Sequence, residues 1–294
     1  MMHDPLAAPV LDTAGLDLDS ASRITYRLEQ SFRYEYDAPV ENLRHRLVVV
    51  PPRRHGDVHR RQHSVEVRGE PARRVERRGA QGNTIIHIRA GRVEERIEFH
   101  LLAVLERVVA DGAPALPGSA LASARLRTPT ALTRPDDRLR DLAATLARPG
   151  EHPAGTAERV CAAVHEAMTY RGGVTSVTTT AAQALEGGAG VCQDFAHVML
   201  SLCHLLDVPA RYVSGHLLGQ GGTHAWVEVV VPHGPAAQAL AFDPCNGRRA
   251  GRGHITVATG RDYTDVAPTS GSYDGSGAGR LTCSRSVGVI DVAA

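Results

Sequence analysis

Apolar and polar side chains alternate in short runs through the first third of the chain. The runs lie at 24–28, 32–36, 43–47, 65–67 and 93–105, and Pro, Gly and Asn separate them. A period of two between turn residues is typical of antiparallel strands. We therefore predict an N-terminal antiparallel β-sandwich over residues 23–110, preceded by a disordered or extended segment over residues 1–22.

The period changes to that of helices in the second half. Residues 136–147 and 156–170 each carry an apolar stripe, and a short helix at 181–186 has Thr180 as its N-cap. Strands are indicated at 210–217, 223–232 and 281–292, the last of which closes a sheet. The pattern predicts an α+β domain over 136–294, joined to the sandwich by an Ala-, Pro- and Gly-rich linker over 111–135.

One predicted helix begins at a cysteine that follows a glycine-rich approach. After Gly187, Gly188 and Gly190, the helical stripe comprises Phe195, Val198, Met199, Leu202, Leu205 and Leu206. Free N–H groups and the positive end of the helix dipole favour a thiolate at its first turn, so Cys192 is the candidate nucleophile. The alternative is that Cys192 is only a small buried apolar residue.

A base and an orienting acid are expected on the hairpin that follows. Residues 223–232 and 240–244 flank the turn-forming sequence Pro-His-Gly-Pro, and a turn about His233 and Gly234 places His224 directly opposite Asp243. Directly opposed side chains share a face and lie about 4.5–5.5 Å apart at Cβ. Asp243 can then hold one ring nitrogen of His224 while the other receives the proton of the thiol.

Three further histidines compete for the role of base. His197 lies about 140° round the helix from the cysteine and points elsewhere, and His204 lies farther along it. His216 is the stronger rival, although no acid has an argued position beside it. Asp194, in the first turn, suits the helix dipole but opposes a nearby thiolate unless Arg171 or Arg211 neutralises it.

Composition adds few constraints. The 294 residues carry a net charge of +1, and all 33 Lys and Arg residues are Arg, so the chain offers no amine of its own for crosslinking. Five cysteines without a CxxC pair suggest neither a disulfide framework nor a zinc site, and we expect no metal and no cofactor. Neither a secretory signal nor a long apolar run is recognisable, so a cytoplasmic location without membrane contact is expected.

The N-terminal domain is locally rich in arginine. The basic residues are Arg53, Arg54, Arg60, Arg61, Arg73, Arg74, Arg77 and Arg78. Neither aromatic platforms nor a nucleic-acid motif accompany them, so we expect no nucleic acid as a partner. A solvated surface is the simpler interpretation, and a basic face for an acidic partner protein remains open.

Several segments together resemble the bacterial transglutaminase-like proteins, which are relatives of the papain-like cysteine proteases. The matching motifs are GVCQDFAH at 190–197, PARYVSG at 209–215, THAWVE at 223–228, FDP at 242–244 and the segment 254–268. Upstream, residues 24–107 resemble the β-rich domain attached to this core, including Gly82-Asn83 before a strand. One departure is Cys245, where the family often has Thr.

The resemblance implies a papain-like core in which a Cys-bearing helix packs on an antiparallel sheet. It implies Cys192 as nucleophile, His224 as general base and acid, and Asp243 as the residue that orients the ring. The Cys192 N–H would supply one oxyanion donor, with Tyr170 and Gln193 as candidates for the second.

The implied chemistry is acyl transfer from a peptide or protein carboxamide through a Cys thioester. We expect a peptidase or amidase. The alternatives are a protein-glutamine gamma-glutamyltransferase with an amine acceptor and a non-catalytic protein-binding module that retains the fold.

Overall fold

The structure is a computed structural model that describes residues 8–12 and 16–294. Parts of the N-terminal segment predicted to be disordered or extended, residues 1–7 and 13–15, lie outside the described residues. Within the described part, Leu11 donates its N–H to the carbonyl of Val289 at 2.8 Å. No helix among the described residues is long and apolar enough to cross a membrane.

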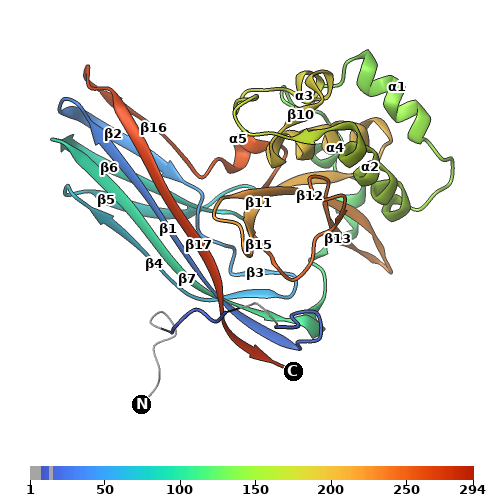
Figure 1. Cartoon of the computed structure of the whole chain (residues 1–294), viewed down its shortest axis with the longest axis horizontal. Helices are drawn as coiled ribbons and strands as arrows, with labels where there is room; N and C mark the ends of the chain where they lie inside the picture. The colour runs from blue at the N-terminus through green and yellow to red at the C-terminus, as the bar shows by residue number, and fades with distance from the viewer. Residues whose placement is uncertain (1–7, 13–15) are drawn as a thin grey trace.

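Two antiparallel sheets form the N-terminal half, as the alternating pattern predicts (Figure 1). One sheet has the order β17-β1-β7-β4-β3, and the other has the order β16-β2-β6-β5. Their strands are β1 (Arg23–Tyr36), β2 (Val40–Leu47), β3 (Arg54–His55), β4 (Val58–Arg68), β5 (Arg73–Arg78), β6 (Thr84–Val93), β7 (Arg96–Val108), β16 (Thr269–Asp274) and β17 (Gly279–Ala293). Alternate side chains such as Phe32, Leu43, Ile88 and Phe99 meet in one core between the sheets.

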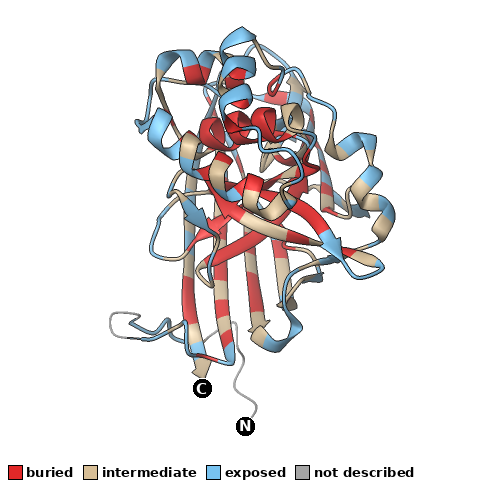
Figure 2. Ribbon diagram, turned by 90° about the vertical axis from the view of Figure 1, so that its right-hand side faces the viewer, coloured by how far each residue is buried: buried red, intermediate tan, exposed pale blue. Residues whose placement is uncertain are grey.

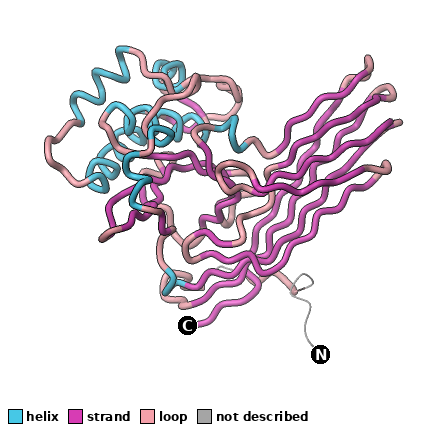
Figure 3. Tube along the Cα trace, turned by 180° about the vertical axis from the view of Figure 1, so that it is seen from behind, coloured by secondary structure: helices cyan, strands magenta, loops and turns pink. Residues whose placement is uncertain are grey.

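The two C-terminal strands belong to these sheets. β17 pairs with β1 from Arg23↔Ala293 to Tyr36↔Gly279, and β16 pairs with β2. The sandwich therefore extends beyond the predicted range of 23–110, because strands from the range 136–294 complete both of its sheets. The predicted closure of a sheet by 281–292 takes place in the first domain, and Figure 3 shows these strands running together.

A second unit packs helices on one face of an antiparallel sheet. The sheet has the order β14-β13-β12-β11-β15, and the short β8 pairs with β13. Its strands are β8 (Ala115–Leu116), β11 (Ala210–Leu217), β12 (His224–His233), β13 (Ala236–Asp243), β14 (Arg248–Arg249) and β15 (His254–Gly260). The helices are α1 (Asp137–Leu146), α2 (Pro153–Ala167), α3 (Ala181–Gly187), α4 (Cys192–Leu205) and α5 (Tyr263–Val266).

The linker contributes three 3₁₀ helices, and two short strands lie before α4. The 3₁₀ helices are η1 (Val109–Asp111), η2 (Gly118–Ala122) and η3 (Ala124–Leu126), and the strands are β9 (Thr169–Tyr170) and β10 (Ala189–Gly190). α4 is the central helix, with eleven consecutive buried residues from Gln193 to Cys203. Figure 2 shows burial concentrated in this central helix and along the strands below it, while the helices around it are exposed on their outer faces.

Among the polar contacts that join the two units, two are made by the buried side chains of Asn83 and Glu228. The Asn83 side chain donates to the Thr259 carbonyl at 2.7 Å and accepts from the Thr259 N–H at 3.0 Å. Gly82, whose φ of +82° favours glycine, turns the chain so that Asn83 can reach β15. The Gly82-Asn83 pair noted in the sequence therefore fastens the sandwich to the second sheet.

The other contact is a buried carboxylate held by two bases. Glu228 on β12 is 2% exposed and accepts from Arg211 Nε of β11 at 2.7 Å. His55 Nε2, from β3 of the sandwich, lies 2.5 Å from its other oxygen. Burial raises the pKa of Glu228, but Arg211 and His55 outweigh it and lower that pKa to about 2. The carboxylate is thus held charged at the junction of the two units.

Candidate active site

The candidate nucleophile lies where prediction placed it, at the first residue of α4. Gly188, with φ +61°, ends α3, and the strand residue Gly190 then leads into α4. A Cβ on Gly190 would lie 2.5 Å from Asp194 Oδ2, so only glycine fits beside that carboxylate. The Cys192 N–H is among the first-turn groups that a helix leaves without an intrahelical partner.

Asp194 secures the start of α4, and neither predicted arginine pairs with it. Its Oδ2 accepts from the Val191 N–H at 2.8 Å and from the Thr175 hydroxyl at 2.7 Å. Arg211 pairs with Glu228 instead, and the structure places no ion pair between Arg171 and this carboxylate. Burial raises the pKa of Asp194, against the effect of these hydrogen bonds. The prediction that Arg171 or Arg211 neutralises Asp194 is therefore wrong.

His224 and Asp243 meet as predicted, in a register that differs from the prediction. His224 Nε2 lies 2.8 Å from Asp243 Oδ2, and both side chains are buried. In the hairpin, Val227 pairs with Phe242 and His233 pairs with Ala236. Each residue of β12 therefore pairs with a residue two positions later in β13 than a turn about His233 and Gly234 predicts. A shift of two preserves the face, because side chains alternate along a strand. The two residues are therefore diagonal rather than directly opposed.

The imidazole also interacts with the thiol. Cys192 is half-buried, and its Sγ lies 4.0 Å from the carbonyl oxygen of Thr223, the residue before His224. Burial lowers the pKa of His224, but hydrogen bonding to Asp243 and to Cys192 outweighs it and raises that pKa to about 9. The ring is thus stabilised as imidazolium between a carboxylate and a sulfur.

The rival histidines have other partners. His197 Nε2 accepts from the Tyr263 N–H at 3.2 Å, and His216 Nδ1 donates to the Gly222 carbonyl at 3.2 Å. Burial lowers the pKa of each ring, and of His204, to about 4. These rings are neutral near pH 7. Burial raises the pKa of the thiols of Cys161, Cys203 and Cys245 to about 12, which disfavours their thiolate forms.

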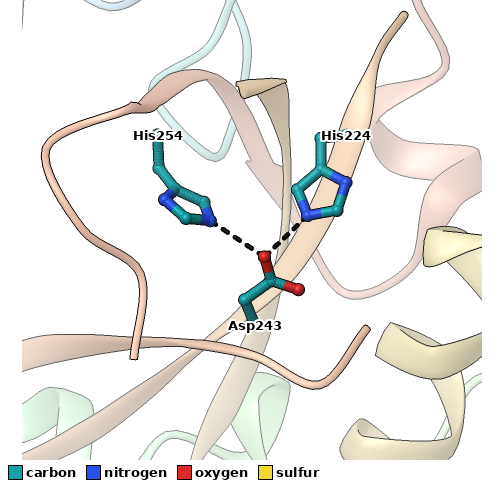
Figure 4. A group of neighbouring side chains, drawn as sticks. All are labelled: His224, Asp243 and His254. Carbon is teal, nitrogen blue, oxygen red and sulfur yellow. Dashed lines mark hydrogen bonds and ion pairs between the residues drawn. The ribbon is translucent and has the colours of Figure 1, made fainter. Parts of the chain in front are cut away.

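A second histidine on Asp243 was missed by sequence reasoning. His254, the first residue of β15, has its Nε2 2.9 Å from Asp243 Oδ2 (Figure 4). Its Nδ1 accepts from the Gly251 N–H at 3.0 Å, so the proton is on Nε2 and that nitrogen donates to Asp243. Asn246 adds a donor to the same oxygen at 2.7 Å. These donors outweigh burial and hold the pKa of Asp243 well below its usual range.

The only signal for His254 was its place in the C-terminal motif. The strand pairing explains why it reaches the site: β15 lies beside β11, with Leu217 opposite His254, while Gly215 of β11 lies opposite His224. A Cβ on Gly215 would lie 2.5 Å from the Trp226 ring, so glycine is needed there. That ring packs edge-on against His254, with centroids 5.2 Å apart.

The same three residues are of the types that bind zinc. Ligand atoms of His224, Asp243 and His254 all lie within 4.8 Å of one another, the one such group found in the described part of the chain. Each histidine already uses its Nε2 in a hydrogen bond to the carboxylate. These bonds account for the cluster without a metal, and the absence of metal and cofactor stays a prediction.

The two oxyanion candidates differ in exposure and in partners. Tyr170 is 62% exposed, and its strand β9 runs parallel to β10, with Tyr170 opposite Gly190. Burial and the nearby Cys192 both raise the pKa of Tyr170, which keeps its hydroxyl a donor. The Gln193 side chain instead donates to the Val177 carbonyl at 3.4 Å. This bond favours Tyr170 as the second donor, which stays a prediction.

Known protein families match both units. Residues 140–244 match the Transglutaminase-like superfamily, and residues 26–106 match the Bacterial transglutaminase-like N-terminal region. An uncharacterised protein of Mycobacterium leprae is 38% identical over 121 residues, which make up 38% of this chain and 42% of that protein. A second, from Mycobacterium tuberculosis, is 35% identical over 120 residues, or 37% of this chain and 38% of that protein.

The match thus spans about two fifths of the length of these relatives. Among solved structures, a candidate cysteine protease from Cytophaga hutchinsonii superposes with a TM-score of 0.70 at 19% identity. The superposition covers 91% of this chain and 98% of that one, so the two proteins share a fold across both units.

Proposed function

Because the chain contains a domain of the transglutaminase-like superfamily and the bacterial N-terminal region that accompanies it, we propose that it is a cysteine enzyme acting on peptide or carboxamide bonds. One observation carries this proposal. His224 is hydrogen-bonded to Asp243 at 2.8 Å and interacts with Cys192, and these bonds raise its pKa to about 9. Such a ring stabilises a thiolate and can return a proton to a leaving group.

The proposed reaction has two halves. The Cys192 thiolate attacks the carbonyl carbon, forming an S–C bond while the carbonyl electrons move to oxygen, which the Cys192 N–H stabilises. Collapse of this intermediate breaks the C–N bond, and the leaving amine takes the proton of His224. Water then gives a proton to His224 as it attacks the thioester. The S–C bond breaks, and the carboxylic acid and the free thiolate–imidazolium pair are released.

Hydrolysis is the proposed outcome, although an amine could attack the same thioester. Water needs no dedicated binding site, whereas an amine acceptor must be held and must exclude water. The description of the Cytophaga hutchinsonii protein as a candidate cysteine protease points the same way. A protein-glutamine gamma-glutamyltransferase is the alternative that the experiment must separate.

The segment before α4 suggests which substrate side chains are preferred. Tyr170, Val174 and Val177 are 62%, 49% and 55% exposed, which makes them the three most exposed of the large hydrophobic side chains among the described residues. The segment is fixed to α4, because Thr175 donates to Asp194 and Gln193 donates to the Val177 carbonyl. An exposed apolar surface held beside the nucleophile suits an apolar side chain next to the scissile bond.

Selective alkylation tests the nucleophile. We expect iodoacetamide near pH 7 to modify Cys192 first, and His224→Ala to slow this modification by about tenfold or more. Cys283→Ala removes another half-buried thiol and serves as the control. Peptide mapping identifies the modified residue. Labelling of Cys192 no faster than that of Cys161 or Cys203 would favour a binding module over an enzyme.

A peptide panel tests the reaction. Glutamine-containing peptides with either Leu or Asp beside the target bond are incubated with and without a primary amine, and the products are weighed by mass spectrometry. Hydrolysis predicts cleavage or deamidation without amine adducts, and faster turnover of the Leu peptide. Amine adducts as the main product would assign a transferase instead. Cys192→Ala should lower either activity by at least about a thousandfold.

A further inference from the structure

A cleft lined by arginines lies on the sandwich, away from the candidate active site. Its volume is about 790 Å³. We call it the arginine cleft, and its charged lining consists of Arg53, Arg54, Arg60, Arg61, Arg77, Arg78, His59 and Glu76. Six arginines thus face one glutamate, so the cleft concentrates positive charge in a protein whose net charge is only +1.

Only two of these six arginines form an ion pair with a described residue. Arg54 pairs with Asp111, Arg61 pairs with Glu106, and Arg60 donates to the Pro51 carbonyl at 2.9 Å. Arg53, Arg77 and Arg78 are exposed, and their side chains form neither an ion pair nor a hydrogen bond with any described residue. Three guanidinium groups are therefore free to bind carboxylates.

The surroundings of Arg60 disfavour its positive charge. It is half-buried, and burial together with the charge of Arg53 lowers its pKa, against an opposing effect of Glu76. A guanidinium that is partly removed from water beside a second cation is stabilised when an anion binds. The cleft is thus better matched to an anionic occupant than to water alone.

The shape of the site favours an extended occupant. A second cavity of about 520 Å³ shares Pro52, Arg54, Arg78 and Gly82 with the arginine cleft and continues to Arg211 on β11. The cleft also borders two sheet edges: β5 pairs only with β6 among the described strands, and β3 covers β4 only at Val58 and His59. An extended polypeptide can use both the arginines and the free backbone groups of such edges.

We propose that the arginine cleft binds an extended acidic polypeptide segment of a partner protein. Carboxylates at alternate positions of such a segment would point to one face and meet Arg53, Arg77 and Arg78. Among the described residues no Phe, Tyr or Trp lines the cleft, so it lacks the large aromatic platforms on which single-stranded nucleic acids stack. Binding here does not depend on the chemistry proposed at Cys192.

Fluorescence anisotropy on the full chain tests the proposal. The probe is a fluorescein-labelled peptide in which Glu and Ser alternate, and the Gln-Ser peptide is its uncharged counterpart. The triple variant Arg53→Gln/Arg77→Gln/Arg78→Gln should weaken binding by at least about tenfold. The matched control Arg44→Gln/Arg89→Gln/Arg138→Gln removes the same charge from exposed arginines outside the cleft and should stay within about twofold.

A variant that gains affinity guards against an effect of misfolding. Glu76→Gln removes the carboxylate of the cleft, whose one ion pair with a described residue is a long contact of 3.6 Å to His63. It should tighten binding by about threefold. Equal losses in the two triple variants would overturn the proposal, as would equal binding of the Gln-Ser peptide. Tighter binding of a single-stranded oligonucleotide of matched charge, lost in the same variant, would also overturn it.

Discussion

Two buried carboxylates on neighbouring strands have similar surroundings and different partners. Glu228 and Asp243 are 2% and 0% exposed, and each accepts hydrogen bonds from two basic side chains. Glu228 is held by Arg211 and His55, at the junction with the sandwich. Asp243 is held by His224 and His254, beside the candidate nucleophile.

The two sites differ in whether the positively charged partner of the carboxylate can lose its proton near neutral pH. A guanidinium group is a permanent cation, so the pair with Arg211 gives Glu228 a fixed partner at the junction of the two units. Asp243 has only imidazoles, and the charge of His224 depends on a proton that can move. A buried carboxylate paired with a guanidinium therefore has a structural role. One paired with an imidazole can take part in proton transfer, because the charge of its partner changes with protonation.

The largest expected effect separates the two carboxylates by activity. Asp243→Asn keeps the shape but loses the charge that holds the imidazolium, and should lower kcat/KM by about 10³–10⁴-fold. The measurement is peptide hydrolysis on purified, folded protein. Asp137→Asn, the same change at a 98% exposed side chain, is the control and should leave kcat/KM unchanged. Retention of more than a tenth of the activity by Asp243→Asn would contradict its role.

The corresponding substitution at the other carboxylate, Glu228, should lower stability rather than activity. Glu228→Gln leaves Arg211, whose side chain is only 16% exposed, without its counter-charge. It should lower the free energy of unfolding by about 3–5 kcal/mol, while kcat/KM of the folded fraction changes little. Urea denaturation measures the first quantity. Glu158→Gln, which removes an exposed pair with Arg249, should cost no more than about 0.5 kcal/mol.

Stability should also depend on acid through Glu228. Because its folded pKa is about 2, below that of the unfolded chain, its contribution is present above about pH 4.3 and is lost as the pH falls toward 2. If Glu228→Gln removed activity without changing stability, the distinction between the two carboxylates would fail.

The smallest effect concerns pH and His254. The folded pKa of His224 is about 9, so kcat/KM should fall as the pH rises through that value. Stability should follow the same sign, being complete below about pH 6.5 and lost through pH 9.

His254→Ala removes one donor from Asp243, which then accepts more strongly from His224. We expect the alkaline limb to move to higher pH and kcat to fall by about tenfold. His254→Gln can still donate and should restore the limb toward its original position. Identical pH profiles in all three proteins would assign His254 a packing role only.

Local patterns were sufficient to bring Cys192, His224 and Asp243 forward as candidates. A helix beginning at Cys192 and a hairpin carrying His224 follow from periodicity and turn residues over short stretches. The hairpin register was wrong by two residues, yet His224 and Asp243 still share a face. Because side chains alternate between the two faces of a strand, a register error of two residues leaves His224 and Asp243 on the same face. An error of one residue would have placed them on opposite faces.

What could not be predicted depends on pairings between distant segments. His254 reaches Asp243 because β15 lies beside β11, and nothing local to either strand specifies that order. Likewise, His55 meets Glu228 across two units, over a separation of 173 residues. The predicted partners of Asp194 failed for a related reason, since Arg211 was already taken by Glu228.

The pairing of β1 with β17 sets an order of events during synthesis. Strand β1 emerges from the ribosome early, but one of its edges finds its partner only after residues 279–293 have been made. Until then an unsatisfied strand edge of fourteen residues is open to misassociation, so the nascent chain depends on protection during translation. Cleavage of the linker would leave the second unit attached to the sandwich through β16 and β17, because its chain returns to both sheets.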